Sequence, residues 1–176
     1  MPVRDFEDHR PDIHPEAWLD ETALVIGDVR IGAESSVWPY TVVRGDVNRI
    51  RIGARSNIQD HCVLHVSHDG PVHPGGADLI IGNGVTVGHG AVLHGCHIGN
   101  HCLIGMRATV LDGVIVEPLT ILGAGALVPP GKTLASGYLW LGSPARRVRA
   151  LTQEEIDNIE YSARHYVRLM KRHRSE

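Results

Sequence analysis

Three histidines stand at positions whose spacing could bring them together on one metal ion. Two of them, His89 and His94, lie five residues apart in a stretch of glycine, alanine, valine and leucine. The third, His65, follows Leu64 in the same way that His94 follows Leu93. Neutral imidazoles are common ligands of zinc, and iron and cobalt also accept them. The first hypothesis is therefore a metal centre built from His65, His89 and His94.

A repeat of six residues positions these histidines. Aliphatic residues recur at this interval from Ile98 to Val128. The same interval appears in pieces upstream, at Ile31, Val37 and Val43, then Ile52, Ile58 and Leu64, then Ile81, Val87 and Leu93. A period of six is typical of the hexapeptide parallel β-helix, in which three hexapeptides close one triangular coil. The aliphatic side chains fill the coil, and small residues such as Cys62 and Ala91 fit at the fifth position of each repeat.

The stacking of coils predicts which histidines meet. His65 and His94 follow the third aliphatic residue of neighbouring coils, so we expect one above the other, about 4.8 Å apart. His89 lies around a corner, and we expect it to reach an ion held by the corresponding pair of another copy, in a trimer. Three imidazoles leave one coordination position for water. The ion lowers the pKa of that water and makes it a hydroxide nucleophile.

The repeat is interrupted at three places, all next to these candidate residues. Three extra residues fall beside Arg44-Gly45-Asp46, a loop is inserted near 66–79, and Leu93 and Ile98 are only five residues apart. Insertions in a solenoid mark the face where function lies.

The last part of the chain changes period. Thr152 and Glu155 form a capping box, and apolar residues follow at helical spacing. We therefore predict a helix from 152 to about 172 that covers the prism. The expected organisation is a β-helix domain over 1–148, with an N-terminal cap and the loop near 66–79, and a helix within 149–176 that packs on it.

Composition excludes several classes of function. Lys plus Arg is 17 and Asp plus Glu is 20 in 176 residues, so we expect no nucleic-acid partner. No apolar run could span a membrane and the charged start lacks a signal-peptide segment, so we expect a cytoplasmic protein without a membrane partner. Cys62, Cys96 and Cys102 lack zinc-ribbon spacing, and we interpret Cys62 and Cys102 as small buried residues.

A set of short motifs occurs in fixed order along nearly the whole chain. They are Arg44-Gly45-Asp46, Asn57-Ile58-Gln59-Asp60, Leu64-His65-Val66, Val87-Gly88-His89, Leu93-His94-Gly95-Cys96 and Gly142-Ser143-Pro144-Ala145. This set resembles the gamma-class carbonic anhydrases and their bacterial carbonic anhydrase-like relatives. The resemblance implies a left-handed β-helix and a homotrimer with a metal ion at each subunit interface, held by His65, His94 and a neighbour's His89; zinc is the first choice, and iron or cobalt is possible. The implied reaction is the reversible hydration of carbon dioxide to bicarbonate.

The resemblance also implies roles for polar residues around the ion. Gln59 corresponds to the residue that orients the metal-bound water, and Arg44 and Asp46 correspond to a charged pair near the interface. Tyr161 corresponds to an aromatic residue near the site. A neutral amide such as Gln59 can orient a hydroxide without cancelling the charge of the ion.

Asn57 and Asp60 correspond to the flanking polar residues. In the predicted stacking, Asp60 lies directly below His89. It could orient that imidazole, or it could pair with Arg44 across the trimer interface, and both interpretations stay open.

One position departs from the family pattern. Val47 follows Asp46 where the best-characterised gamma enzymes carry a glutamate that is thought to move protons. The loop offers His68, with a reference pKa near 6.5, as a replacement, and we expect weaker activity. The alternative, for His68 and also for His73, His97 and His101, is a solvated surface side chain without a role in the reaction.

Two other functions fit the repeat. One is a hexapeptide acyltransferase that uses an acyl-CoA, although such enzymes usually need one histidine as a base. The other is a non-catalytic trimeric scaffold that a metal ion stabilises.

Overall fold

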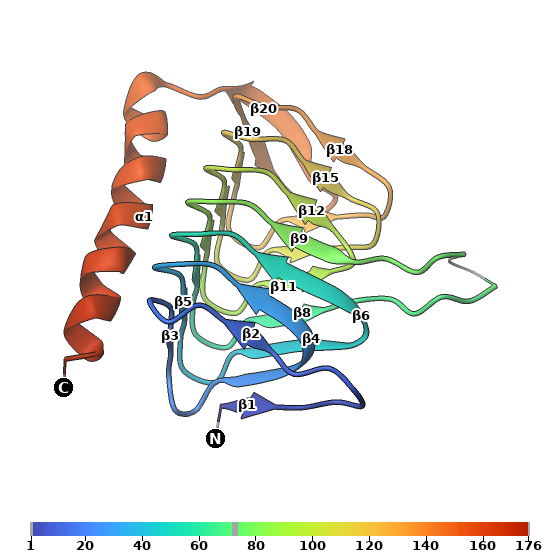
Figure 1. Ribbon diagram of the computed structural model, residues 1–176. Helices are drawn as coiled ribbons and strands as arrows, with labels where there is room; N and C mark the ends of the chain where they lie inside the picture. Colours follow the sequence, from blue (N-terminus) through green and yellow to red (C-terminus); the bar gives the residue numbers. More distant parts are fainter. Residues whose placement is uncertain (1, 72–73, 176) are drawn as a thin grey trace.

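The six-residue repeat forms a parallel β-solenoid with three faces, and a helix runs beside it (Figure 1). This computed structural model describes residues 2–71 and 74–175. Each repeat gives a short strand that pairs in parallel with strands of the coils before and after it. The predicted fold class, a left-handed parallel β-helix with a C-terminal helix, is confirmed.

The first face carries His65 and His94. It comprises β1 (Val3–Arg4), the first half of β4 (Leu24–Ile31), the first half of β6 (Val42–Ile52), β8 (Val63–His65), β11 (Val92–His94), β14 (Thr109–Val110) and β17 (Leu127–Val128). Val43, Leu64 and Leu93 are in register and fully buried, which confirms the predicted grouping of repeats into coils.

The second face contains the extra residues that follow Arg44. It comprises β2 (Asp12–Ile13), the second halves of β4 and β6, β9 (Leu79–Ile81), β12 (His97–Ile98), β15 (Ile115–Val116) and β18 (Thr133–Leu134). Gly27 pairs with Gly45, but Val29 pairs with Ile50, so the predicted insertion is a bulge in β6. A Cβ on Gly27 would lie 2.3 Å from the Gly45 carbonyl oxygen, so the two strands need a glycine there.

The third face is covered by the helix. It comprises β3 (Trp18–Leu19), β5 (Ser36–Val37), β7 (Asn57–Ile58), β10 (Thr86–Val87), β13 (Leu103–Ile104), β16 (Ile121–Leu122), β19 (Tyr138–Leu141) and the antiparallel β20 (Arg146–Ala150).

Helix α1 (Gln153–His173) packs on this face, against β5, β7 and β10. The predicted capping box is present at Thr152 and Glu155, and the helix buries Ile159, Ala163 and Met170. No helix in the described part of the chain has both the length and the apolar character needed to cross a membrane.

The solenoid is longer than the repeat recognised in the sequence. Ile13 and Leu19 continue the six-residue interval back from Val25, and they are in register with Ile31 and Val37. The segment predicted as an N-terminal cap therefore adds strands to the end of the solenoid. At the other end, β18 and β19 continue the second and third faces.

The interior holds aliphatic residues and small residues in alternation. Cys62, Cys96 and Cys102 are free and buried, as predicted for Cys62 and Cys102. Burial raises the pKa of the Cys62 thiol to about 12, so this side chain acts as a small apolar residue.

Candidate metal centre

His65 and His94 face each other at the ends of β8 and β11. Their backbones are in register, and His65 Nδ1 lies 3.0 Å from His94 Nε2. The predicted stacking of these two histidines is therefore confirmed. The other ring nitrogens contact carboxylates: His65 Nε2 lies 3.1 Å from Asp46 Oδ1, and His94 Nδ1 lies 2.5 Å from Asp112 Oδ1. Each ring thus turns one nitrogen toward its neighbour and the other toward an acid.

Asp46 connects this pair to Arg44. Arg44 Nη1 donates a hydrogen bond to Asp46 Oδ2 over 2.5 Å, so the charged pair predicted from the sequence forms within one chain. Burial opposes ionisation of Asp46, but the hydrogen bonds from Arg44 and His65 outweigh it and hold the pKa of Asp46 below 3.8. Burial lowers the pKa of His65 below 6.5, and the hydrogen bond with Asp46 opposes that shift only in part. A neutral imidazole beside a carboxylate is the form that binds a metal ion.

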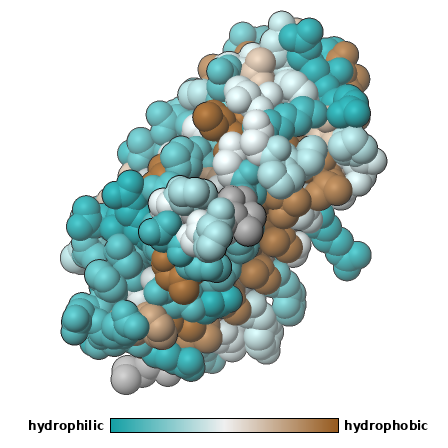
Figure 2. Space-filling model, turned by 90° about the vertical axis from the view of Figure 1, so that its right-hand side faces the viewer, coloured by the Kyte–Doolittle hydropathy of each residue, from teal (hydrophilic) through white to brown (hydrophobic). Residues whose placement is uncertain are grey.

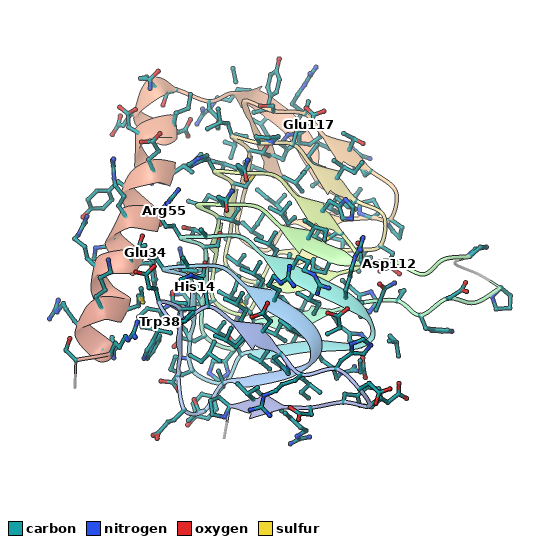
Figure 3. All side chains as sticks on the ribbon, viewed as in Figure 1. His14, Glu34, Trp38, Arg55, Asp112 and Glu117 are labelled. Carbon is teal, nitrogen blue, oxygen red and sulfur yellow. The ribbon has the colours of Figure 1, made fainter. Side chains whose placement is uncertain are left out.

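Two residues that were not predicted complete this cluster, Asp112 and Ser67. Ser67 Oγ donates to Asp112 Oδ2 over 2.8 Å. Figure 3 shows Asp112 on the side of the solenoid from which the loop projects. Coil spacing was the available signal, because Val110 is in register with Leu93 and Asp112 follows two residues later. We call the cluster the paired-histidine group; it consists of Arg44, Asp46, His65, Ser67, His94 and Asp112.

His89 lies at the opposite edge of the first face, in the corner between β10 and β11. Its Nδ1 lies 2.8 Å from Asp60 Oδ2, and its side chain is 46% exposed. This contact supports the first of the two interpretations of Asp60, in which the carboxylate orients the imidazole. Nε2 of His89 is left for a ligand bond outside this contact.

Gln59 and Asn57 lie beside this corner in a buried row of hydrogen bonds. Gln59 Nε2 donates to Asn57 Oδ1 over 3.1 Å, and Asn57 Nδ2 donates to Thr86 Oγ1 over 3.0 Å. The Thr86 hydroxyl lies 3.2 Å from that of Ser162 on α1. Thr86 and Ser162 were not predicted, although Thr86 is in register with Asn57. We call this cluster the single-histidine corner; it consists of Asn57, Gln59, Asp60, Thr86, His89 and Ser162.

A cavity of about 400 Å³ opens at the single-histidine corner. Gln59, His89 and Ser162 line it, together with Met106 and Tyr166. The predicted aromatic residue lies elsewhere in this chain: Tyr161 is 54% exposed on α1, with the Arg168 guanidinium 5.8 Å from its ring centroid. Tyr166 is the aromatic side chain at this cavity, and burial together with the nearby charge of Asp60 raises its pKa.

The candidate residues therefore form two groups within one chain. In the described ranges, 2–71 and 74–175, no three His, Cys, Asp or Glu side chains are arranged to hold a metal ion. A site with all three histidines needs residues from another copy.

The remaining histidines named above have different surroundings. His68 is exposed, and His97 Nε2 donates a hydrogen bond to Asp78 Oδ1 over 2.7 Å. His101 is only partly a surface residue, since its Nδ1 is buried and has no hydrogen-bond partner among the residues described. His73 lies outside the described residues.

Known proteins resemble this chain over nearly its whole length. The family model for bacterial transferase hexapeptide (six repeats) matches residues 95–130. Protein YrdA of Escherichia coli is 49% identical over 94% of this chain and 90% of its own. The mitochondrial gamma carbonic anhydrase 1 of Arabidopsis thaliana is 47% identical over 96% of this chain. The present chain spans 61% of the length of that plant protein.

Solved structures agree with these sequence matches. A hexapeptide transferase family protein from Anaplasma phagocytophilum is 38% identical, with 96% of each chain covered and a TM-score of 0.89. A provisionally named acetyltransferase of Bacillus cereus is also 38% identical, with 98% and 96% covered and a TM-score of 0.91. The order of the motifs, the fold and these identities lead to one conclusion: the chain belongs to the hexapeptide-repeat family that includes YrdA and the gamma carbonic anhydrases.

Proposed function

We propose that this protein is a metal-dependent enzyme of the gamma carbonic anhydrase type, which interconverts carbon dioxide and bicarbonate. The observation that carries the proposal is the pair of facing nitrogens on His65 and His94, each ring backed by a carboxylate. His89 of a neighbouring copy would complete a set of three imidazoles. Zinc is the first choice for such a set, with iron or cobalt as alternatives.

The chemistry of the paired imidazoles fits a cation between them. Asp46 and Asp112 accept hydrogen bonds, so the proton of each neutral ring lies on His65 Nε2 and on His94 Nδ1. The facing nitrogens then both carry lone pairs, so at a separation of 3.0 Å they need either a shared proton or a metal ion between them. Two nitrogen ligands of a tetrahedral zinc ion are about 3.3 Å apart, which is close to this separation.

The outer side of the first face supports a trimer. On the outer side of the first face, one side chain from each of five successive strands lies in a row, and the row is mainly aliphatic: Val42, Val63, Val92, Thr109 and Leu127. The outward row of the second face is more mixed, with Arg30 and Arg51 followed by Ile80, His97 and Ile115. Figure 2, which shows the side that carries the loop, has a diagonal band of hydrophobic side chains on an otherwise hydrophilic surface. Packing about a threefold axis would cover this row of the first face. It would also bring the paired-histidine group of one copy next to the single-histidine corner of its neighbour.

Each polar residue then has a role around the ion. When bound, zinc would supply a Lewis acid that makes water a nucleophile near neutral pH. Arg44 and Asp46 fix the ring of His65. Asn57 holds the Nε2 of Gln59, and the Gln59 Oε1, which has no hydrogen-bond partner among the described residues, is available to orient a small polar molecule at the cavity.

Proton transfer is the step for which this chain is least well equipped. Hydration releases one proton in each turnover, and Val47, which is 45% exposed, cannot carry it. Exposed His68 at the start of the loop is the candidate carrier in this chain. We therefore expect a lower turnover than in a gamma enzyme with an acidic carrier.

Acyl transfer from an acyl-CoA is the second candidate function. It is favoured by the names of the two structural neighbours and by the largely apolar cavity beside His89. In that case His89, which is held by Asp60, would act as a base without a metal ion.

One preparation tests these candidates together. We expect about one zinc ion per chain, a trimer in solution, and stopped-flow carbon dioxide hydration that a chelator abolishes. A metal-free trimer with no hydration activity would contradict the proposal. Binding of acetyl-CoA at micromolar concentration would favour acyl transfer, and a metal-bound trimer that is inactive in both assays would favour a scaffold.

A further inference from the structure

His94 has a carboxylate of its own, Asp112, on the next coil. Asp112 Oδ1 lies 2.5 Å from His94 Nδ1, and Asp112 Oδ2 accepts a hydrogen bond from Ser67. We propose that Asp112 is a positioning residue, which keeps the proton of His94 on Nδ1 and presents the lone pair of Nε2 to the metal ion. This inference rests on the proposed metal site and adds a residue to it.

The contacts of Asp112 leave little freedom in its orientation. Its side chain is 17% exposed, and Ser67 and His94 bind its two oxygens. A Cβ on Gly95 would lie 2.5 Å from Asp112 Oδ1, so the shortened repeat with glycine at this corner lets the carboxylate approach. A carboxylate so placed accepts hydrogen bonds only, and this fixes the tautomer of the ring beside it.

Asp112 also links the inserted loop to the paired histidines. Ser67 begins the loop and pairs with Ala77 at its other end, with N–O distances of 3.0 and 3.1 Å. Asn48 Nδ2 donates to the Ser67 carbonyl oxygen over 3.3 Å, so the bulge of β6 also holds the base of the loop. The backbone of Ser67, whose hydroxyl binds Asp112, is thus held both by the β6 bulge and by the far end of the loop.

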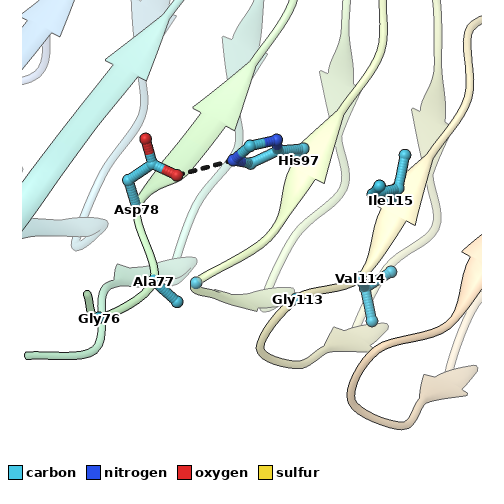
Figure 4. A pocket seen from close by; sticks show the side chains of 8 residues that line it. Gly76, Ala77, Asp78, His97, Gly113, Val114 and Ile115 are labelled. Atoms are coloured by element: carbon cyan, nitrogen blue, oxygen red, sulfur yellow. Dashed lines mark hydrogen bonds and ion pairs between the residues drawn. The ribbon is translucent and has the colours of Figure 1, made fainter. Parts of the chain in front are cut away.

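The neighbouring face offers a matched control in Asp78 and His97. Figure 4 shows this pair at a separate pocket, joined by a hydrogen bond of 2.7 Å between Asp78 Oδ1 and His97 Nε2. Asp78 is 18% exposed and its second oxygen also has a partner, Arg49 Nε at 2.9 Å. The two aspartates therefore match in burial, and each contacts a histidine through Oδ1, but only Asp112 supports a histidine that faces another.

Cobalt binding distinguishes positioning from general stability. We expect Asp112→Ala to weaken Co²⁺ binding, measured by visible absorption, by about 10–100-fold. Asp112→Asn keeps an oxygen acceptor and should restore most of the affinity, whereas Asp78→Ala should change it less than about twofold. Equal losses in Asp112→Ala and Asp78→Ala would overturn the inference.

Nitrogen NMR of the metal-free protein keeps this test separate from the proposed function. With ¹⁵N-labelled histidine, and His94 assigned by its loss in His94→Gln, we expect the wild-type ring to carry its proton on Nδ1. Asp112→Ala should shift the tautomer toward Nε2, and Asp78→Ala should not. A wild-type His94 protonated on Nε2 would overturn the inference even if Asp112→Ala failed to fold. An Nδ1 tautomer that depends on Asp112, in a protein that binds no metal, would show that Asp112 orients His94 although the proposed function had failed.

Discussion

The paired-histidine group and the single-histidine corner are built by the same six-residue repeat, but the first brings two histidines together and the second holds one. In the first, rings from two successive coils meet at 3.0 Å, with carboxylates on both sides. In the second, His89 stands alone, half exposed, with Asp60 behind it. A solenoid brings equivalent positions together along its axis, but it cannot bring opposite edges of one face together. If a third histidine completes the proposed metal site, it must therefore come from another chain.

Removing either half should abolish metal binding if the halves form one site. We expect His94→Ala and His89→Ala each to weaken zinc binding by more than about hundredfold, because each removes one of three ligands. Metal content after gel filtration measures this. His97→Ala, on the neighbouring face, is the control and should keep its metal. Full metal content in His89→Ala would limit the site to the paired-histidine group.

Strand β11 follows His89 and ends at His94, and its inward side chain should contribute strongly to the stability of the fold. Leu93 is fully buried in β11, between His89 and His94. Leu93→Ala should lower the free energy of unfolding by about 2–5 kcal/mol, because it leaves a cavity in the core. Val63→Ala, on the outer side of β8, should cost the single chain less than about 1 kcal/mol. Urea denaturation in the presence of a chelator gives both values, and equal effects would contradict the assigned core.

The single-histidine corner has one carboxylate, Asp60, so its removal should weaken metal binding through His89. We expect Asp60→Ala to weaken metal binding by about tenfold, since His89 loses the acceptor that orients it. Asp60→Asn should lose less because an amide oxygen can still accept from Nδ1. Isothermal titration with zinc gives these affinities, and an Asp60→Ala protein with wild-type affinity would show that His89 needs no support.

Helix α1, which backs the corner through Ser162, should respond to acid. The Arg149 guanidinium and the backbone of Thr152 lower the pKa of Glu155 from 4.5 to about 2. The group therefore stabilises the fold above pH 4.5, and this contribution is lost as the pH falls from 4.5 through about 2. Urea midpoints should fall between about pH 5 and pH 3 more in the wild type than in Glu155→Gln. An identical fall in both proteins would assign the acid sensitivity to other groups.

The six-residue period was sufficient to predict the solenoid and the stacking of His65 on His94, because inward aliphatic residues fix the register of every coil. It also placed Asp60 below His89. Asp112, Ser67, Thr86 and Ser162 were missed for a physical reason. The repeat gives the coil position of Asp112 and Thr86, but their contacts depend on how a corner turns, how the loop returns or where α1 packs, and the repeat does not set these. Hydrophobic spacing alone also carries no information on the hand of the coil, which came from family resemblance.

A mixing experiment tests most directly whether the two halves belong to different chains. The His89→Ala chain keeps His65 and His94, and the His94→Ala chain keeps His89. A mixed trimer therefore has an intact site wherever a His89→Ala chain supplies the histidine pair and its neighbour, a His94→Ala chain, supplies His89. Co-expression at equal levels should restore metal and carbon dioxide hydration at about a quarter of the sites, although each variant alone has neither. Mixed trimers with no more metal than the separate variants would contradict the shared site.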